Sequence, residues 1–158
     1  MGAEKNVENH IKNDLKKITW YAKFFANSFT VKGVPDILSI IDGKFTVFEV
    51  KRPTGGKPTP IQIKNLTQIA KHGGISLITN DPHIVPKIKQ YIDDPQSINL
   101  TKNHIFTYQA SSLEQVSVNT ATKIWRHPND QSTPKEPYSV LVTYKEDFPV
   151  DQKHIKYI

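Results

Sequence analysis

The chain has 158 residues, no cysteine and a formal net charge of +6. This length suits one domain with a sizeable core and room for a small extension. The absence of cysteine excludes disulfides and cysteine-based zinc sites and favours a cytoplasmic setting. No apolar run is long enough to cross a membrane, and the polar start MGAEKNVENH predicts no signal peptide.

The first predicted element is an amphipathic helix over residues 4–18. Its apolar stripe recurs at helical spacing and consists of Val7, Ile11, Leu15 and Ile18. Glu8 lies at the edge of this stripe. It has two interpretations, an exposed first-turn acid that favours the helix N-terminus or a member of a functional site.

Residues 19–31, TWYAKFFANSFTV, are rich in aromatic and β-branched residues and predict a strand. We expect most of these aromatic side chains in the core, with stacking on nucleic-acid bases as the alternative. Lys32-Gly33 then predicts a turn, where glycine permits a backbone conformation closed to other residues.

Residues 35–51 predict a β-hairpin. The apolar run at 37–41 follows Pro35-Asp36, Asp42-Gly43 is a hairpin turn signal, and the second strand ends on Glu49-Val50-Lys51. Side chains alternate along a strand, so Glu49 and Lys51 share one face. Because Asp36 starts the first strand and Glu49 ends the second, the hairpin brings the two carboxylates together.

Two neighbouring carboxylates repel each other unless a cation lies between them. Oxygen ligands suit Mg²⁺ or Mn²⁺, which take one or two protein carboxylates together with water and substrate phosphate. A nearby lysine orients the attacking water or stabilises charge that develops on phosphate. Asp36, Glu49 and Lys51 therefore fit metal-assisted phosphodiester hydrolysis. The plain alternative is an exposed ion pair worth only ~0–1 kcal/mol.

The next residues predict a loop, a helix and a buried strand. The loop RPTGGKPTP at 52–60 leads into a helix over 60–72, with Thr59 as N-cap and Gln62 in the first turn. The apolar strand at 75–79 completes a strand–helix–strand unit, which implies parallel pairing. A further helix is expected at about 83–93.

The composition changes after residue 94. We expect residues 95–158 to form a β-rich C-terminal extension to a core of residues 1–94. Strand-like alternation occurs at 104–109 and 116–126, and 138–144 predicts a further strand. The polar stretch 127–137 has the composition of an exposed loop. The role of the extension is open between covering the sheet, forming a dimer interface and recruiting a partner.

The positive charge lies in the first part of the chain. Residues 1–92 carry 14 Lys and Arg against 7 Asp and Glu, whereas residues 93–158 carry 7 against 8. This excess favours a polyanion partner, with a solvated lysine-rich surface as the alternative. Nineteen of the 21 basic residues are lysine, which favours backbone or shape recognition of DNA over base reading. The candidate DNA-binding residues are Lys32, Arg52, Lys57 and Lys64.

The motif residues resemble the PD-(D/E)XK nuclease superfamily. Pro35-Asp36, twelve intervening residues and Glu49-Val50-Lys51 match its motif, and Gln62 matches a glutamine of the family at a helix start. Within the superfamily, the Gly33-Val34-Pro35-Asp36 context is most similar to the VRR-NUC group, which is related to Holliday-junction resolvases. The resemblance covers residues 4–92.

The resemblance implies an α/β fold with a restriction-endonuclease-like αβββαβ core, a mixed central sheet flanked by helices. It implies a Mg²⁺- or Mn²⁺-dependent endodeoxyribonuclease, with structured or branched DNA as a candidate substrate. Asp36 and Glu49 would be metal ligands, with Glu8 as a third, and Lys51 and Gln62 would complete the catalytic set. A homodimer and a bacterial or phage-infected cytoplasm are also implied. The alternative is a catalytically weak module of the same fold that binds DNA or protein.

Overall fold

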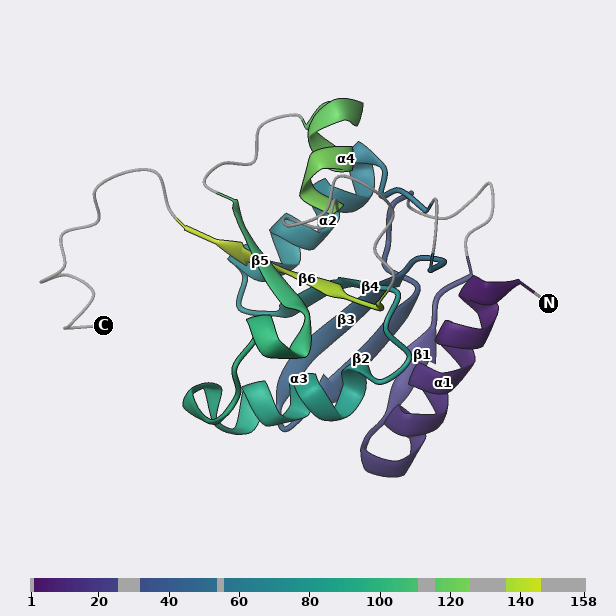
Figure 1. Cartoon of the computed structure of the whole chain (residues 1–158), viewed down its shortest axis with the longest axis vertical. Helices are drawn as coiled ribbons and strands as arrows, with labels where there is room; N and C mark the ends of the chain where they lie inside the picture. Colours follow the sequence, from purple (N-terminus) through teal and green to yellow (C-terminus); the bar gives the residue numbers. More distant parts are fainter. Residues whose placement is uncertain (1, 26–31, 54–55, 111–115, 126–135, 146–158) are drawn as a thin grey trace, which may run out of the picture.

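A mixed six-stranded sheet with helices on both faces forms the described part of the chain (Figure 1). The computed structural model describes residues 2–25, 32–53, 56–110, 116–125 and 136–145. The strands are β1 (Tyr21–Lys23), β2 (Ile37–Ile41), β3 (Lys44–Val50), β4 (Ile75–Thr79), β5 (Ile105–Ala110) and β6 (Ser139–Tyr144), in the spatial order β1-β2-β3-β4-β6-β5. The helices are α1 (Ala3–Ile18), α2 (Pro60–Lys71), α3 (Ile84–Asp93) and α4 (Val118–Trp125), and two 3-10 turns span Pro95–Ser97 and Thr101–Asn103. The architecture is therefore α/β.

The expected hairpin is present as β2 and β3. Asp42 and Gly43 both have positive φ, 48° and 80°, as a two-residue turn between antiparallel strands requires. The register places Ile37 opposite Phe48. β3 then pairs in parallel with β4, because α2 carries the chain back to the start of the sheet.

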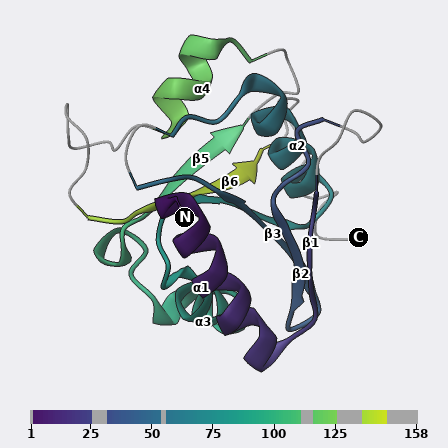
Figure 2. The ribbon, with the colours of Figure 1, turned by 90° about the vertical axis from the view of Figure 1, so that its right-hand side faces the viewer.

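Two apolar layers hold the helices on the sheet. One face is covered by α1 and α3, whose Ile11, Leu15 and Ile88 pack against Phe48 and the rest of that face. The opposite face is covered by α2 and α4 through a second cluster that contains Ile63, Leu66, Ala121 and Trp125. Figure 2 shows the sheet between these two pairs of helices. Since neighbouring residues of β3 face opposite layers, Val47 packs toward α2 and Phe48 toward α1.

The strand expected over 116–126 is wrong, because residues Val118–Trp125 form α4. Ala121 and Trp125, four residues apart, are the buried positions, which is helical spacing. Ser117 begins the helix, and its hydroxyl accepts a hydrogen bond from the Thr120 amide at 3.1 Å. The β-branched residues of this segment suggested a strand, but the cap and the four-residue spacing determine a helix.

The strand expected over 19–31 is shorter in the described residues, where β1 covers only Tyr21–Lys23 and residues 26–31 lie outside them. Most of the polar stretch 127–137 also lies outside the described residues. Ile18, expected in the buried stripe of the first helix, is 44% exposed at its end.

The part of the chain after residue 94 contributes two strands to the same sheet. β6 lies between β4 and β5, antiparallel to the former and parallel to the latter. Within the described ranges, no helix has the length and apolar character needed to cross a membrane.

Candidate functional site

The hairpin brings Asp36 and Glu49 together at one end of the sheet. Extending the β2–β3 register by one pair places Asp36 opposite Glu49. The Val50 amide donates a hydrogen bond to Asp36 Oδ2 at 2.8 Å, and this bond fixes the carboxylate across the end of β3. Glu49 is almost completely buried, with 2% of its surface exposed. The two carboxyl groups are within hydrogen-bonding reach of each other.

Glu49 has an environment that opposes its ionisation. Burial, followed by the repulsion from Asp36 and the hydrogen bond shared with it, raises the pKa of Glu49 to about 9, and Lys51 offsets only part of this rise. Its Oε1 atom is buried and accepts no hydrogen bond from the described residues. Glu49 therefore keeps its proton at neutral pH unless a cation takes the proton's place.

Lys51 and Gln62 contact each other, although they come from different elements. Lys51 Nζ donates to Gln62 Oε1 at 3.1 Å and lies 3.4 Å from Glu49 Oε2. Gln62 is held in turn by a capping box at the start of α2, where its Oε1 accepts from the Thr59 amide at 2.9 Å. The cap of α2 therefore also positions the ammonium group of Lys51.

Glu8 reaches the site only through a lysine that the sequence patterns did not single out. Lys23 Nζ lies 2.7 Å from Glu8 Oε1 and 3.5 Å from Asp36 Oδ1. Lys5 Nζ lies 3.3 Å from the other oxygen of Glu8. The sequence did not identify Lys23 as a site residue, because the strand around it is short and was predicted from its aromatic and β-branched residues. The available signal was the single lysine within a segment otherwise rich in aromatic and β-branched residues.

The ion pairs of Glu8 and Lys23 shift both groups toward their charged forms. Burial acts to raise the pKa of Glu8, but Lys23 and then Lys5 outweigh it, and the pKa lies below its ordinary value. Burial acts to lower the pKa of Lys23, but Glu8 and Asp36 outweigh it, and the pKa is raised. The described site thus forms a connected series of charged residues, Glu8–Lys23–Asp36–Glu49–Lys51, in which Asp36 and Glu49 are the one pair of like groups.

The donor set fits a hard divalent cation held by two carboxylates. Asp36 and Glu49 supply oxygen ligands, and the buried Oε1 of Glu49 has no hydrogen bond that a cation would need to break. Mg²⁺ binds through one or two carboxylates and keeps several waters. Among the described residues, no three His, Asp or Glu side chains converge as one ligand group. Glu8 is therefore not assembled with Asp36 and Glu49 as a third ligand.

A hollow of about 310 Å³ opens beside Asp36. Its lining residues are Lys23, Phe24, Phe25, Gly33, Val34, Asp36 and Gln62. Phe25 is 72% exposed, and Lys23 Nζ lies 5.8 Å from the centre of its ring. The hollow is wide enough for a group the size of a phosphate ester to approach the carboxylates.

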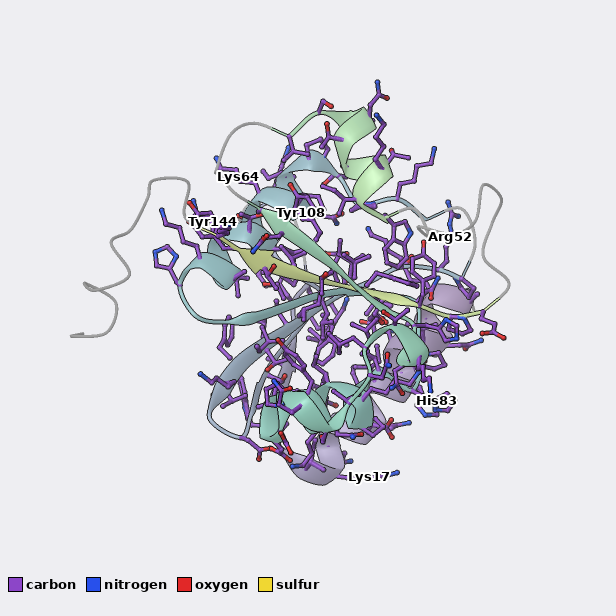
Figure 3. The ribbon with its side chains drawn as sticks, turned by 60° about the vertical axis from the view of Figure 1, so that its left-hand side comes forward. Lys17, Arg52, Lys64, His83, Tyr108 and Tyr144 are labelled. Carbon is purple, nitrogen blue, oxygen red and sulfur yellow. The ribbon has the colours of Figure 1, made fainter. Side chains whose placement is uncertain are left out.

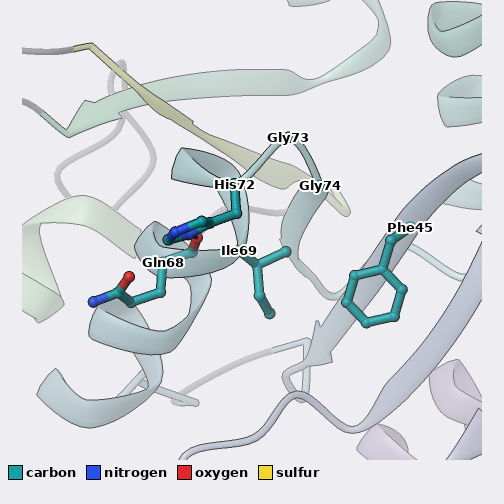
Figure 4. A pocket seen from close by; sticks show the side chains of 6 residues that line it. All are labelled: Phe45, Gln68, Ile69, His72, Gly73 and Gly74. Carbon is teal, nitrogen blue, oxygen red and sulfur yellow. Dashed lines mark hydrogen bonds between the residues drawn. The ribbon is translucent and has the colours of Figure 1, made fainter.

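A second hollow, of about 400 Å³, lies away from these residues (Figure 4). It is bordered by the start of β3 and the end of α2, the ends opposite Lys51 and Gln62, and Phe45, Ile69 and His72 line it. No carboxylate or ammonium group lines this hollow, so it lacks the groups that hydrolysis would need.

The four candidate DNA-binding residues are all exposed, namely Lys32, Arg52, Lys57 and Lys64. Lys32 lies beside α2, since its carbonyl accepts a hydrogen bond from Asn65 Nδ2 at 3.0 Å. Figure 3 shows Arg52 and Lys64 well apart on the surface. The four residues therefore do not form one compact patch.

Comparison of the chain with protein-family models, with curated proteins and with solved structures found no significant match.

Proposed function

We propose that this protein is a metal-dependent nuclease that hydrolyses phosphodiester bonds of DNA. The observation that carries the proposal is the carboxyl pair formed by the half-buried Asp36 and the buried Glu49, with Lys51 beside it. A protein gains no stability from burying a second acid next to the first. Such an arrangement is typical of sites where function, rather than folding, selects the residues.

In this proposal, Asp36 and Glu49 would hold Mg²⁺ or Mn²⁺, and the bound ion would supply polarisation of the phosphate and activation of a water molecule. Lys51 donates hydrogen bonds from its ammonium group to the phosphate oxygens, where negative charge increases during the reaction. Gln62 orients Lys51 through the 3.1 Å contact. Asp36 is oriented by the Val50 amide. The hollow beside Asp36 admits the DNA backbone.

The order of elements supports a finer assignment of the fold. From α1 to β4 the chain runs helix, three strands, helix and strand. We assign this run to a restriction-endonuclease-like αβββαβ core, with the exposed basic residues binding the DNA backbone. Structured or branched DNA is the proposed substrate class.

A module that binds DNA without cutting it is the second candidate. The charges favour it in one respect, because Lys23 and Lys51 carry two positive charges against the two negative charges of Glu8 and Asp36, and Glu49 carries a proton. The described site is therefore electrically balanced without a metal. Binding that needs no divalent cation, with no cleavage, would support this candidate.

A cleavage assay decides between the two candidates. Wild type and Lys51→Ala would be incubated with plasmid, linear, single-stranded and four-way-junction DNA in Mg²⁺, Mn²⁺ or EDTA. Lys44→Ala is the matched control, because Lys44 is exposed at the opposite end of the same strand. We expect metal-dependent cutting by wild type and Lys44→Ala, and a loss of about a hundredfold or more in Lys51→Ala. Intact binding without cutting on any substrate would overturn the nuclease assignment.

A further inference from the structure

Lys23 places an ammonium group between two carboxylates of the site. It bridges Glu8 Oε1 at 2.7 Å and Asp36 Oδ1 at 3.5 Å. Its side chain is 19% exposed, so the bridge is largely shielded from solvent. The bridge joins α1 to the hairpin, two elements that contribute acids to the same end of the sheet.

The oxygen atoms that face Lys23 are the ones left available on both acids. Asp36 Oδ2 already accepts from the Val50 amide, and Glu8 Oε2 contacts Lys5. A cation bound by both acids would therefore use Glu8 Oε1 and Asp36 Oδ1. Lys23 occupies the space between these two atoms, and its charge would repel a divalent ion placed there.

The ammonium group of Lys23 also has a neighbour other than the two carboxylates. Lys23 lines the 310 Å³ hollow, and its Nζ lies 5.8 Å from the centre of the exposed Phe25 ring. A lysine has a flexible four-carbon stem. Rotation about that stem would let the charge leave the space between the carboxylates while it keeps the cation–π contact with the ring.

We propose that Lys23 is an internal counter-ion that a divalent cation must displace before Glu8 and Asp36 can both bind it. Lys23 thereby sets the concentration of cation at which the site fills, and it holds α1 against the hairpin when no metal is bound. This inference rests on the proposed function, since it requires that Asp36 binds a metal ion. In this scheme Glu8 becomes a ligand only after Lys23 has moved.

The first test measures binding of Mn²⁺ to the full chain without DNA, by the loss of the electron paramagnetic resonance signal of free Mn²⁺. Lys23→Met should bind Mn²⁺ about tenfold more tightly than wild type or better, a typical size for coupling between two ligands. Lys16→Met is the control for net charge, because Lys16 is exposed on the same helix as Glu8, and it should change the affinity little. Asp36→Asn should bind Mn²⁺ weakly or not at all.

The outcomes separate this inference from the proposed function. If wild type binds Mn²⁺ through Asp36 and Lys23→Met binds it no more tightly, the counter-ion role is overturned while the nuclease proposal stands. If neither wild type nor Lys23→Met binds Mn²⁺, both are overturned. A purely structural role of Lys23 would lower stability without tightening metal binding.

A second measurement uses only the wild-type protein and so does not depend on the folding of a variant. The rate of reductive methylation of Lys23 would be followed by mass spectrometry with and without saturating Mn²⁺. Displacement from the carboxylates should make Lys23 react faster when Mn²⁺ is bound, while the exposed Lys44 serves as an internal reference with an unchanged rate. A Lys23 rate that stays the same or falls on Mn²⁺ binding would overturn the inference.

Discussion

Among the described residues, Glu49 is an acid whose ionisation is strongly opposed by its surroundings. Burial and the neighbouring Asp36 raise its pKa to about 9, against 4.5 for an ordinary glutamate. Below pH 4.5 the group is protonated in both the folded and the unfolded chain. Between the two values only the folded chain holds the proton, so rising pH favours unfolding.

The free energy of unfolding of the metal-free protein should therefore fall as pH rises from 4.5 toward 9. The slope due to Glu49 is at most about 1.4 kcal/mol per pH unit. Urea unfolding in EDTA between about pH 6 and about pH 8 measures it. Glu49→Gln has nearly the same shape and cannot ionise, so its slope should be flatter. Equal slopes in wild type and Glu49→Gln would show that Glu49 is not protonated in the folded state.

At the scale of residues, the sequence contained enough information to relate Asp36, Glu49 and Lys51. The proximity of these three residues follows from the alternation of side chains along a strand and from one hairpin turn, and both are local rules. Gln62 was also placed at a helix start from local signals. Lys23 was not anticipated, because its role depends on two contacts with residues 15 and 13 positions away. The contact with Glu8 arises from the packing of α1 on the sheet and the contact with Asp36 from the pairing of β1 with β2, which local patterns do not describe.

The turn that precedes the hairpin packs closely against helix α2. The residue at the point of contact has to be glycine. Gly33 has φ +79°, and a Cβ atom there would lie 2.8 Å from Asn65 Nδ2 and 3.0 Å from the backbone carbonyl carbon of Ile61. Gly43 has nearly the same φ, +80°, but open space around it. The two glycines share the backbone requirement and differ only in the contact with α2.

Gly33→Ala should therefore destabilise the protein more than Gly43→Ala. The left-handed backbone alone costs about 1 kcal/mol for alanine, which is the expected effect at Gly43. The overpacking against α2 adds about 1–3 kcal/mol at Gly33. Urea unfolding of both variants measures the difference. If the two variants lose equal stability, the turn is not packed against α2 as described.

At the scale of elements, long or strongly patterned segments were predictable and short mixed ones were not. The apolar stripe of α1, the turn between β2 and β3 and the Thr59 cap of α2 each gave a clear local signal. The segment Val118–Trp125 did not, because its Val, Thr and Ile residues favour strands. Its helical state depends on the packing of Ala121 and Trp125 against the sheet, and such tertiary contacts override weak propensities.

At the scale of the whole molecule, the uneven charge predicts how DNA binding responds to salt. Residues 1–92 carry a net charge of +7, since this part of the chain contains 14 basic and 7 acidic residues. Lysines that neutralise DNA phosphates release counterions, so the logarithm of the affinity should fall with the logarithm of the salt concentration. The slope on duplex DNA is about −0.9 for each phosphate contacted.

Lys57→Ala and Lys64→Ala should each reduce that slope by about one unit, whereas Lys44→Ala should not. Fluorescence anisotropy of labelled duplex DNA at several salt concentrations measures it. Asp36→Asn should leave the slope unchanged, because a carboxylate neutralises no phosphate and so releases no counterion. A flat salt response in wild type would contradict the assignment of the basic residues to DNA binding.

The order of the whole sheet was the part least accessible from the sequence. The pairing of β2 with β3 and that of β3 with β4 join elements that are close together in the chain. Local rules for hairpins and strand–helix–strand units predict both pairings. The pairing of β4 with β6 joins Thr79 to Ser139, 60 residues apart, where their hydroxyl groups share a 2.7 Å hydrogen bond. No periodicity in either strand identifies the other as its partner.

The interior place of β6 has a consequence for the growing chain on the ribosome. β4 and β5 are both synthesised before the strand that lies between them. At about 5–20 residues per second, the 60 residues from Thr79 to Ser139 take roughly 3–12 seconds to emerge. During that interval the apolar edge of β4 has no partner and is open to pairing with other chains. The nascent chain is therefore most open to pairing with other chains before its last described strand emerges.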